Sequence, residues 1–304
     1  VFTNHYTPAY ISAGTFNTEF MTNSGLLPAT GGISTSVYTE NAFPYSMANL
    51  FRQAGYTARS FHNSDGQVYD RGLIHPNLGY EKYYGGYDMQ MESYQLDRHL
   101  INGFDEMTEG DPFYSFVITY SAHGPYGEEN GVYQAHAEEA QAAAQRTDGN
   151  YVYAVAGAME TDLFIGELVD RLTQEGLLED TVLIFYADHY DYYMMDDQLN
   201  MQIKGVDNGN LLQHTDFFIW SADLAPTLFG LDTSGAFLAG HDGLGDQGGY
   251  VFFSDGSWYD GTTYWSSKNG GAGDEARSAE INRITTLSNR VLAGNYYGTA
   301  EQSP

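Results

Sequence analysis

An aspartate and a histidine stand side by side where a hydrophobic stretch of the chain ends. Asp188 and His189 follow Ala187, the one small residue that separates them from the apolar run 181–186. A carboxylate oxygen and an imidazole nitrogen are both ligands of divalent cations, so together they could bind one metal ion. Taken alone, the pair fits an ordinary surface turn equally well.

Thr15 is a second residue whose position suggests chemistry. Gly14 and Thr15 come just before Phe16 and Phe20, whose spacing predicts a helix that begins here. A threonine at such a position commonly caps a helix, and this structural role alone accounts for the pattern. The alternative is that the helix N-terminus attracts an anion such as phosphate beside the hydroxyl. A metal ion bound to that hydroxyl would lower its pKa and make it a nucleophile.

Three other residues, later in the chain, could bind such an anion. His62 follows an expected strand, and Tyr69 and Arg71 come soon after it. An arginine can bind two phosphate oxygens at once, and the chain has only 12 Lys and Arg residues. The competing explanation is a surface arginine paired with Asp70 or Asp65.

Two other histidines are candidates. His123 follows an expected core strand and lies in a Gly-Pro turn, where it could donate a proton to a substrate or leaving oxygen. A histidine in a turn is often only a turn residue. His214 comes just before a short expected strand; it could bind the metal or the phosphate, or form hydrogen bonds at the edge of the core.

These candidates lie at the ends of expected strands or the starts of expected helices. Alternation of strands and helices predicts a parallel α/β sheet, in which ligands bind beyond the carboxyl ends of the strands. The expected strands cover 56–61, 112–120, 181–186 and 217–220, and the expected helices cover 43–54, 151–175, 223–231 and 277–293. The run 181–186 is expected to be a buried central strand, and 248–265 predicts antiparallel strands.

The composition restricts the class of protein. The chain has 304 residues, of which 42% are hydrophobic, enough for a sizeable core. Its formal net charge of −28 argues against binding to nucleic acid or to an anionic membrane. The absence of cysteine excludes disulfides and zinc–thiolate sites. The sequence has no apolar run of about 18 residues, the length that a membrane-spanning helix needs. No signal peptide is visible, and the start at Val1 suggests a processed product or an excised domain.

Several segments, in their order along the chain, resemble the lipoteichoic acid synthase family of the alkaline phosphatase and sulfatase superfamily. The segments that carry the resemblance are 14–20, 25–28, 60–63, 69–71, 78–80, 119–126, 187–190 and 223–228. The resemblance implies a sulfatase-like catalytic domain over residues 1–245, with a central, mostly parallel sheet flanked by helices. Residues 246–304 would add antiparallel strands and a helix packed on the same domain.

The resemblance also implies a metal-dependent phosphoglycerol transferase. Thr15 would be the nucleophile that forms a covalent glycerophosphoryl intermediate. Thr15, Asp188 and His189 would bind one divalent metal ion, Mn²⁺ in most of the family, with Mg²⁺ as the alternative. His123 as a proton donor in catalysis is our addition from its position.

The substrate would be held by His62, Arg71 and His123, with Tyr69 where the family has an aromatic residue that is often Trp. His214 is added here as a further substrate-binding candidate. The reaction would transfer glycerol phosphate from phosphatidylglycerol to a glycolipid or polyglycerolphosphate acceptor. A monomer is expected, on the extracellular face of a bacterial membrane or released from it, with the membrane reached only through upstream helices.

This chain departs from the family at one metal ligand. The family takes a glutamate ligand from the end of its first core strand, upstream of the nucleophile. Only 14 residues precede Thr15 and none of them is acidic, so we expect that strand to be missing here. Two alternatives stay open. One is a phosphodiesterase, phosphoethanolamine transferase or sulfatase-like hydrolase on the same fold, and the other is an inactive domain that binds glycans or lipid headgroups.

Overall fold

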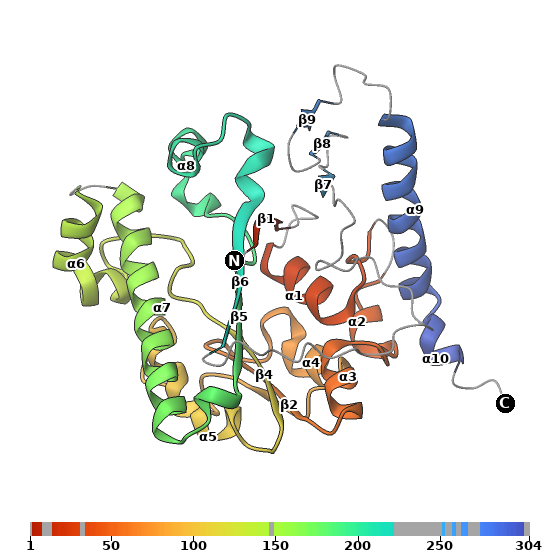
Figure 1. Cartoon of the computed structure of the whole chain (residues 1–304), viewed down its shortest axis with the longest axis horizontal. Coiled ribbons are helices and arrows are strands. Elements are labelled where there is room, and N and C mark those ends of the chain that lie inside the picture. Colours follow the sequence, from red (N-terminus) through yellow and green to blue (C-terminus); the bar gives the residue numbers. More distant parts are fainter. Residues whose placement is uncertain are drawn as a thin grey trace.

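Two three-stranded sheets run through the middle of the molecule, with helices on both sides (Figure 1). The computed structural model describes residues 2–7, 14–30, 34–145, 149–221, 251–252, 257–259, 263–266 and 274–300. The helices are α1 (Gly14–Ser24), α2 (Val37–Glu40), α3 (Met47–Gln53), α4 (Arg71–Asn77), α5 (Phe104–Met107), α6 (Gly131–Ala144), α7 (Gly149–Gln174), α8 (Asp197–Lys204), α9 (Asp274–Ala293) and α10 (Tyr296–Ala300). Helices α6 and α7 lie on one side of the sheets, and α1 to α4 with α9 lie on the other (Figure 1).

The first sheet is parallel and has the order β3-β2-β4. Its strands are β2 (Thr57–His62), β3 (Tyr83–Tyr84) and β4 (Phe113–Ile118). Strands β2 and β4 pair along their whole length, and the last pair joins His62 to Ile118. The residues that follow both strands therefore emerge at the same edge of the sheet.

The second sheet has the order β1-β6-β5 and is antiparallel. Its strands are β1 (Phe2–Tyr6), β5 (Val182–Tyr186) and β6 (His214–Ser221). The expected α/β class is confirmed, but in the described part of the chain only β2, β3 and β4 form a parallel ladder. Strand β1 precedes α1 and is not followed by a carboxylate, since residues 1–14 contain no Asp or Glu.

Strand β5 is less buried than its sequence predicts. Its bounds agree with the expected strand, yet the side chains of Val182 and Ile184 are 45% and 51% exposed. The expectation of a buried central strand was wrong for these residues because β5 is an edge strand within the described part of the chain. It pairs with β6 along one side only.

Strand β2, in contrast, is buried on both faces. Its Ala58 belongs to a core cluster with Phe20 of α1, while Phe61 packs on the opposite face with Leu100 and with Phe164 of α7. The side chains of Ala58, Phe61 and Leu100 are fully buried. This double burial fixes the edge from which His62 emerges.

Glycines end two of the expected helices at the predicted positions. Gly55 follows α3 with a φ of +94° and Gly176 follows α7 with a φ of +71°, conformations that favour glycine at a helix C-terminus. The other expected strands and helices are also confirmed within a few residues at each end. The expected helix at 223–231 lies outside the described residues.

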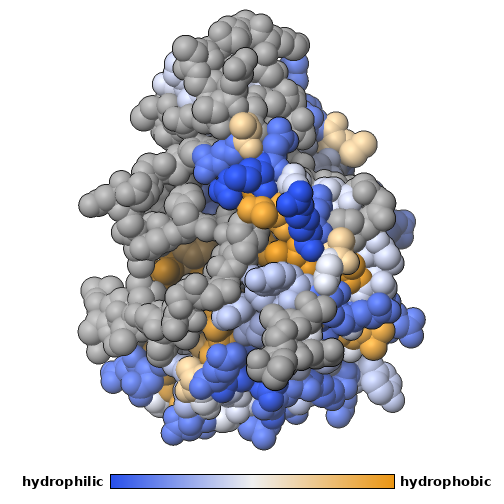
Figure 2. All heavy atoms as spheres, turned by 90° about the vertical axis from the view of Figure 1, so that its right-hand side faces the viewer, coloured by the Kyte–Doolittle hydropathy of each residue, from blue (hydrophilic) through white to orange (hydrophobic). Residues whose placement is uncertain are grey.

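The C-terminal part contributes a small antiparallel sheet and a helix. Strands β7 (Val251–Phe252), β8 (Trp258–Tyr259) and β9 (Tyr264–Trp265) pair in this order, within the segment where antiparallel strands were expected. Helix α9 contributes Leu292 to the core cluster that includes Phe20. Figure 2 looks onto the side of α9, where hydrophilic residues cover most of the coloured surface. No described helix is long and apolar enough to cross a membrane.

Candidate active site

The N-terminus of α1 packs directly against the turn that follows β5. A Cβ atom on Gly14 would lie only 2.9 Å from Cδ2 of His189, so a glycine is needed for this close approach. One turn later, the Thr18 hydroxyl donates a hydrogen bond to the carbonyl of Asp188. Thr15 lies between these two contacts, in the first turn of α1. The helix therefore brings the threonine alongside the Asp188–His189 pair.

The imidazole of His189 is oriented as a metal ligand would be. Its Nδ1 lies 2.9 Å from the carbonyl of Tyr190, and a hydrogen bond donated there leaves the lone pair on Nε2. That Nε2 atom is buried without a hydrogen-bond partner. It lies 3.6 Å from Oδ1 of Asp188, a separation that one ion can bridge with bonds of about 2.1 Å.

These donors fit a divalent cation as part of a set. Among the residues that the structure describes, no group of three or more His, Cys, Asp or Glu side chains could hold a metal ion. The carboxylate of Asp188 and the imidazole of His189 are groups of the kind that bind divalent cations, and Thr15 lies nearby in the first turn of α1. Such a mixed oxygen and nitrogen set suits Mn²⁺ better than a soft metal.

His123 lies beside His189. The two rings meet edge to face with their centres 5.4 Å apart, and Nδ1 of His123 is hydrogen-bonded to the carbonyl of Gly124. Burial lowers the pKa of His123, and the neighbouring His189 acts in the same direction. The imidazole is therefore neutral near pH 7, with Nε2 as its proton-accepting atom.

His62 reaches the same region from the neighbouring strand. Its Nδ1 lies 2.8 Å from the carbonyl of Ile118. Burial, helped by the positive charge of Arg71, lowers its pKa to about 3. The ring of Tyr120 links the two histidines, 6.4 Å from the centre of His62 and 5.7 Å from that of His123. Both imidazoles are thus held in a continuous series of rings.

Arg71 is paired with a residue that the sequence did not reveal. Its Nε and Nη2 donate to the carboxylate of Glu19 at 2.8 to 3.1 Å, and Nε2 of His75 lies 2.6 Å from the same carboxylate. All three side chains are buried. The proposed pairing of Arg71 with Asp70 or Asp65 was wrong. The available signal was the spacing of Glu19, four residues after Thr15 on one helix face.

The backbone just before Arg71 is unusual. Tyr69 and Asp70 both have left-handed conformations, with φ of 56° and 54°, and side chains other than glycine adopt these at some energetic cost. The guanidinium of Arg71 lies 5.0 Å from the centre of the Tyr69 ring, a cation–π contact. That ring is 45% exposed and packs against Phe16 of α1. Tyr69 is therefore a partly exposed aromatic residue that contacts both Arg71 and helix α1.

His214 is placed with the second sheet. It begins β6, pairs with Tyr6 of β1, and its ring packs on the Tyr6 ring at 5.2 Å. The ammonium of Lys204 donates to its carbonyl at 2.6 Å. These contacts are with β1 and α8, and a role in substrate binding stays a prediction.

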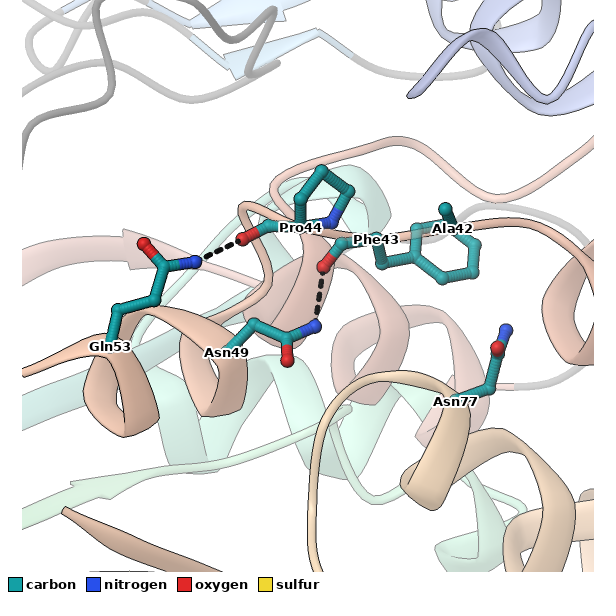
Figure 3. Close-up of a pocket in the computed structure, with 6 residues that line it drawn as sticks. All are labelled: Ala42, Phe43, Pro44, Asn49, Gln53 and Asn77. Carbon is teal, nitrogen blue, oxygen red and sulfur yellow. Dashed lines mark hydrogen bonds between the residues drawn. The ribbon is translucent and has the colours of Figure 1, made fainter. Parts of the chain in front are cut away.

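A separate pocket of about 360 Å³ lies beside α3 and α4, apart from these residues (Figure 3). Its lining consists of Ala42, Phe43, Pro44, Asn49, Gln53 and Asn77. The amide groups of Asn49 and Gln53 donate to the carbonyls of Phe43 and Pro44. No lining residue is titratable or nucleophilic, so the pocket offers no acid, base or nucleophile for a reaction.

Comparisons with known proteins identify the family and the fold of this chain. A family model described as sulfatase matches residues 1–239. The chain belongs to the sulfatase family. The crystal structure of the lipoteichoic acid synthase LtaP of Listeria monocytogenes superimposes on this sulfatase-family chain with a TM-score of 0.74 at 19% sequence identity. The superposition covers 94% of this chain and 82% of that chain, and it confirms the expected sulfatase-like architecture.

Curated relatives of this sulfatase chain carry the family name suggested by its motifs. The lipoteichoic acid synthase of Staphylococcus saprophyticus is 25% identical over 257 residues, or 75% of this chain. Lipoteichoic acid synthase 2 of Bacillus subtilis is 24% identical over 265 residues, or 77% of this chain. The matched part spans 39% of the length of each of these relatives.

Proposed function

We propose that this sulfatase-family chain transfers glycerol phosphate from phosphatidylglycerol to a glycolipid or polyglycerolphosphate acceptor, with one divalent cation, Mn²⁺ or Mg²⁺. The observation that supports this most is the position of Thr15. It lies in the first turn of α1, where Gly14 approaches His189 within van der Waals contact, and His189 keeps a buried, unpaired Nε2. A hydroxyl beside a metal-ligand pair at a helix N-terminus is arranged for attack on phosphorus.

The proposed reaction has two steps. The Oγ atom of Thr15 attacks phosphorus, its proton leaves, and the bond from phosphorus to the diacylglycerol oxygen breaks as that oxygen takes up a proton. An acceptor hydroxyl then attacks the glycerophosphoryl-threonine and releases Thr15. His123, neutral at Nε2, is the group proposed to take and return the proton. A divalent cation at Asp188 and His189 would supply Lewis-acid stabilisation of the phosphoryl charge.

The remaining candidates hold the substrate. The guanidinium of Arg71 is the proposed donor to the phosphoryl oxygens, and Tyr69 flanks the glycerol group. The neutral imidazole of His62, whose Nδ1–H is directed at the Ile118 carbonyl, is proposed to accept a hydrogen bond from a glycerol hydroxyl at Nε2. Because these side chains are fixed by Ile118, Glu19 and the protein interior, they need little reorganisation when substrate binds. The proposed location is the extracellular face of a bacterial membrane.

The test compares Thr15→Ala with Thr173→Ala, a matched control in which the lost hydroxyl only bonds the Val169 carbonyl within α7. With Mn²⁺ and a phosphatidylglycerol analogue, Thr15→Ala should lose glycerol phosphate release by at least about 10³-fold. Mass spectrometry should find a glycerophosphoryl adduct on Thr15 in the unaltered chain only. Unchanged turnover in Thr15→Ala would overturn the proposal.

Metal analysis separates the alternatives. We expect one Mn²⁺ bound per chain, lost in Asp188→Asn and His189→Ala but retained in Thr173→Ala. Bound metal with release of free glycerol phosphate only, and no transfer to acceptor, would favour the hydrolase on the same fold. A chain that binds glycan or headgroup without metal would favour the inactive binding domain.

A further inference from the structure

A single buried carboxylate joins the two loops that carry the histidines of the site. Asp97 begins the 3-10 helix η2 (Asp97–Gly103) and is completely buried. Its Oδ1 accepts from the backbone N–H of Tyr120 at 2.7 Å and from the amide of Asn63 at 3.0 Å. Its Oδ2 accepts from the backbone N–H of Ser121 at 3.1 Å and from the hydroxyl of Thr161 at 2.7 Å.

The four donors lie in the segment after His62, in the segment before His123 and on helix α7. Asn63 directly follows His62 at the end of β2. Tyr120 and Ser121 lie between the end of β4 and His123, whose backbone N–H bonds the Tyr120 carbonyl at 2.8 Å. Thr161 lies on α7 and ties the assembly to that helix. One carboxylate therefore spans the carboxyl ends of two neighbouring parallel strands.

The contact is reciprocal on the side of His123. The backbone N–H of Asp97 donates to the hydroxyl of Ser121 at 2.8 Å, and that hydroxyl donates to the carbonyl of Gln95 at 2.7 Å. The loop before His123 is thus held through both its backbone and its side chain, and it cannot shift without breaking several buried hydrogen bonds.

The chemistry of this arrangement suits an ionised carboxylate. All four groups that point at Asp97 are neutral N–H or O–H donors, so both oxygens must act as acceptors. Burial raises the pKa of Asp97, while the hydrogen bonds from Tyr120, Thr161, Ser121 and Asn63 oppose that rise. Arg98, the next residue, pairs with Glu160 instead.

We propose that Asp97 is a positioning residue that sets the separation of His62 and His123 across the phosphate-binding site. The inference rests on the proposed function for its kinetic consequence, but the geometry it explains is independent of the reaction. Asp97 acts through Asn63 on one loop and through Tyr120 and Ser121 on the other.

The principal variant is Asp97→Asn, which keeps the shape but offers one acceptor oxygen where two are needed. Its matched control is Glu160→Gln, which alters another fully buried carboxylate, bonded to the neighbouring Arg98 and to His136. We expect kcat/KM for a phosphatidylglycerol analogue to fall about 10²-fold in Asp97→Asn, since small misplacements cost that much. Glu160→Gln should stay within about twofold of the unaltered chain, even where both variants lose similar thermal stability.

A second readout does not depend on activity. Nitrogen NMR of the histidine side chains, recorded without metal or substrate, should show shifted resonances for both His62 and His123 in Asp97→Asn and for neither in Glu160→Gln. Should Asp97→Asn fail to fold, Asn63→Ala removes one bond to the carboxylate and is expected to shift His62 alone and to lower kcat/KM about 10-fold.

The outcomes distinguish the two proposals. Unshifted histidine resonances together with kinetics equal to those of Glu160→Gln would overturn the role of Asp97. Shifted resonances in a chain whose Thr15→Ala variant keeps full turnover would support the positioning role and overturn the proposed function instead.

Discussion

Arg71 shares its guanidinium with a buried carboxylate, so its charge is balanced before any substrate arrives. Burial alone would raise the pKa of Glu19, but the charge of Arg71 and the hydrogen bonds of Arg71 and His75 hold it at about 2. Glu19 lies one helical turn beyond Thr15. The same helix therefore fixes the proposed nucleophile and the orientation of the proposed phosphate ligand.

Replacing Glu19 tests this arrangement through stability. Glu19→Gln leaves Arg71 buried without a counter-charge and should cost about 3–5 kcal/mol in the free energy of unfolding at pH 7. In the unaltered chain the pKa of Glu19 is about 2 folded and near 4.5 unfolded. Its contribution is therefore complete above pH 4.5 and is lost as the pH falls toward 2. Urea unfolding between pH 2.5 and pH 7 should show a flatter acid limb in Glu19→Gln.

A matched control is available on the surface. Glu109 also pairs with an arginine, Arg59, but its side chain is 64% exposed, so Glu109→Gln should leave the unfolding curves nearly unchanged. Part of the acid slope will persist in every variant because the pKa of Glu160 is also about 2. An acid limb identical in Glu19→Gln and in the unaltered chain would contradict the assignment.

Residue types revealed the polar candidates in the sequence but not their partners. Asp188, His189 and Thr15 could be singled out because each follows or begins a recognisable periodic segment. Asp97 could not, since it is one of 40 acidic residues and is marked only by burial, which depends on contacts between segments far apart in the chain. Glu19 had only its spacing from Thr15 as a signal, and its pairing with Arg71 depends on the same kind of distant contact.

At the level of whole elements, the site depends on how closely α1 approaches the end of β5. Gly14→Ala adds a Cβ atom 2.9 Å from Cδ2 of His189, so the imidazole must shift. We expect the affinity for Mn²⁺, measured by isothermal titration calorimetry, to fall about 10-fold or more. Unchanged affinity would show that His189 does not bind the metal through its buried Nε2.

The control for Gly14→Ala is another helical glycine. Gly166 of α7 has nothing within 4 Å of an added Cβ, so Gly166→Ala should leave Mn²⁺ binding unaltered and stabilise the fold by about 0.5–1 kcal/mol. A loss of Mn²⁺ affinity in both variants would point to a general effect of helix glycines rather than to contact with His189.

The bounds of the helices and strands along the chain were largely predictable, but which elements lie beside each other in the fold was not. The periodic run of α7 and the glycines Gly55 and Gly176 gave helix bounds close to those observed, because they depend on local sequence. The burial of β5 was misjudged, since Ile184 has the residue type of a central strand but its exposure is decided by which strands lie beside it. The split into a parallel and an antiparallel sheet has the same origin.

Over the whole molecule, the net charge of −28 opposes the proposed substrate. Only 12 basic residues are present, and Arg71 is already neutralised by Glu19. An anionic phosphodiester therefore approaches against a repulsive field, while a divalent cation is attracted by the same field.

This opposition predicts two salt dependences of opposite sign. Between 10 and 150 mM NaCl the Debye length falls from about 30 to about 8 Å, so repulsion is screened and kcat/KM for a soluble, anionic glycerophosphodiester should rise at least about twofold. Over the same range the affinity for Mn²⁺ should fall, because the attraction is screened as well. Activity assays at saturating Mn²⁺ measure kcat/KM, and isothermal titration calorimetry measures the affinity for Mn²⁺ separately. A kcat/KM that falls with salt would mean that the local positive field of the bound cation outweighs the charge of the rest of the surface.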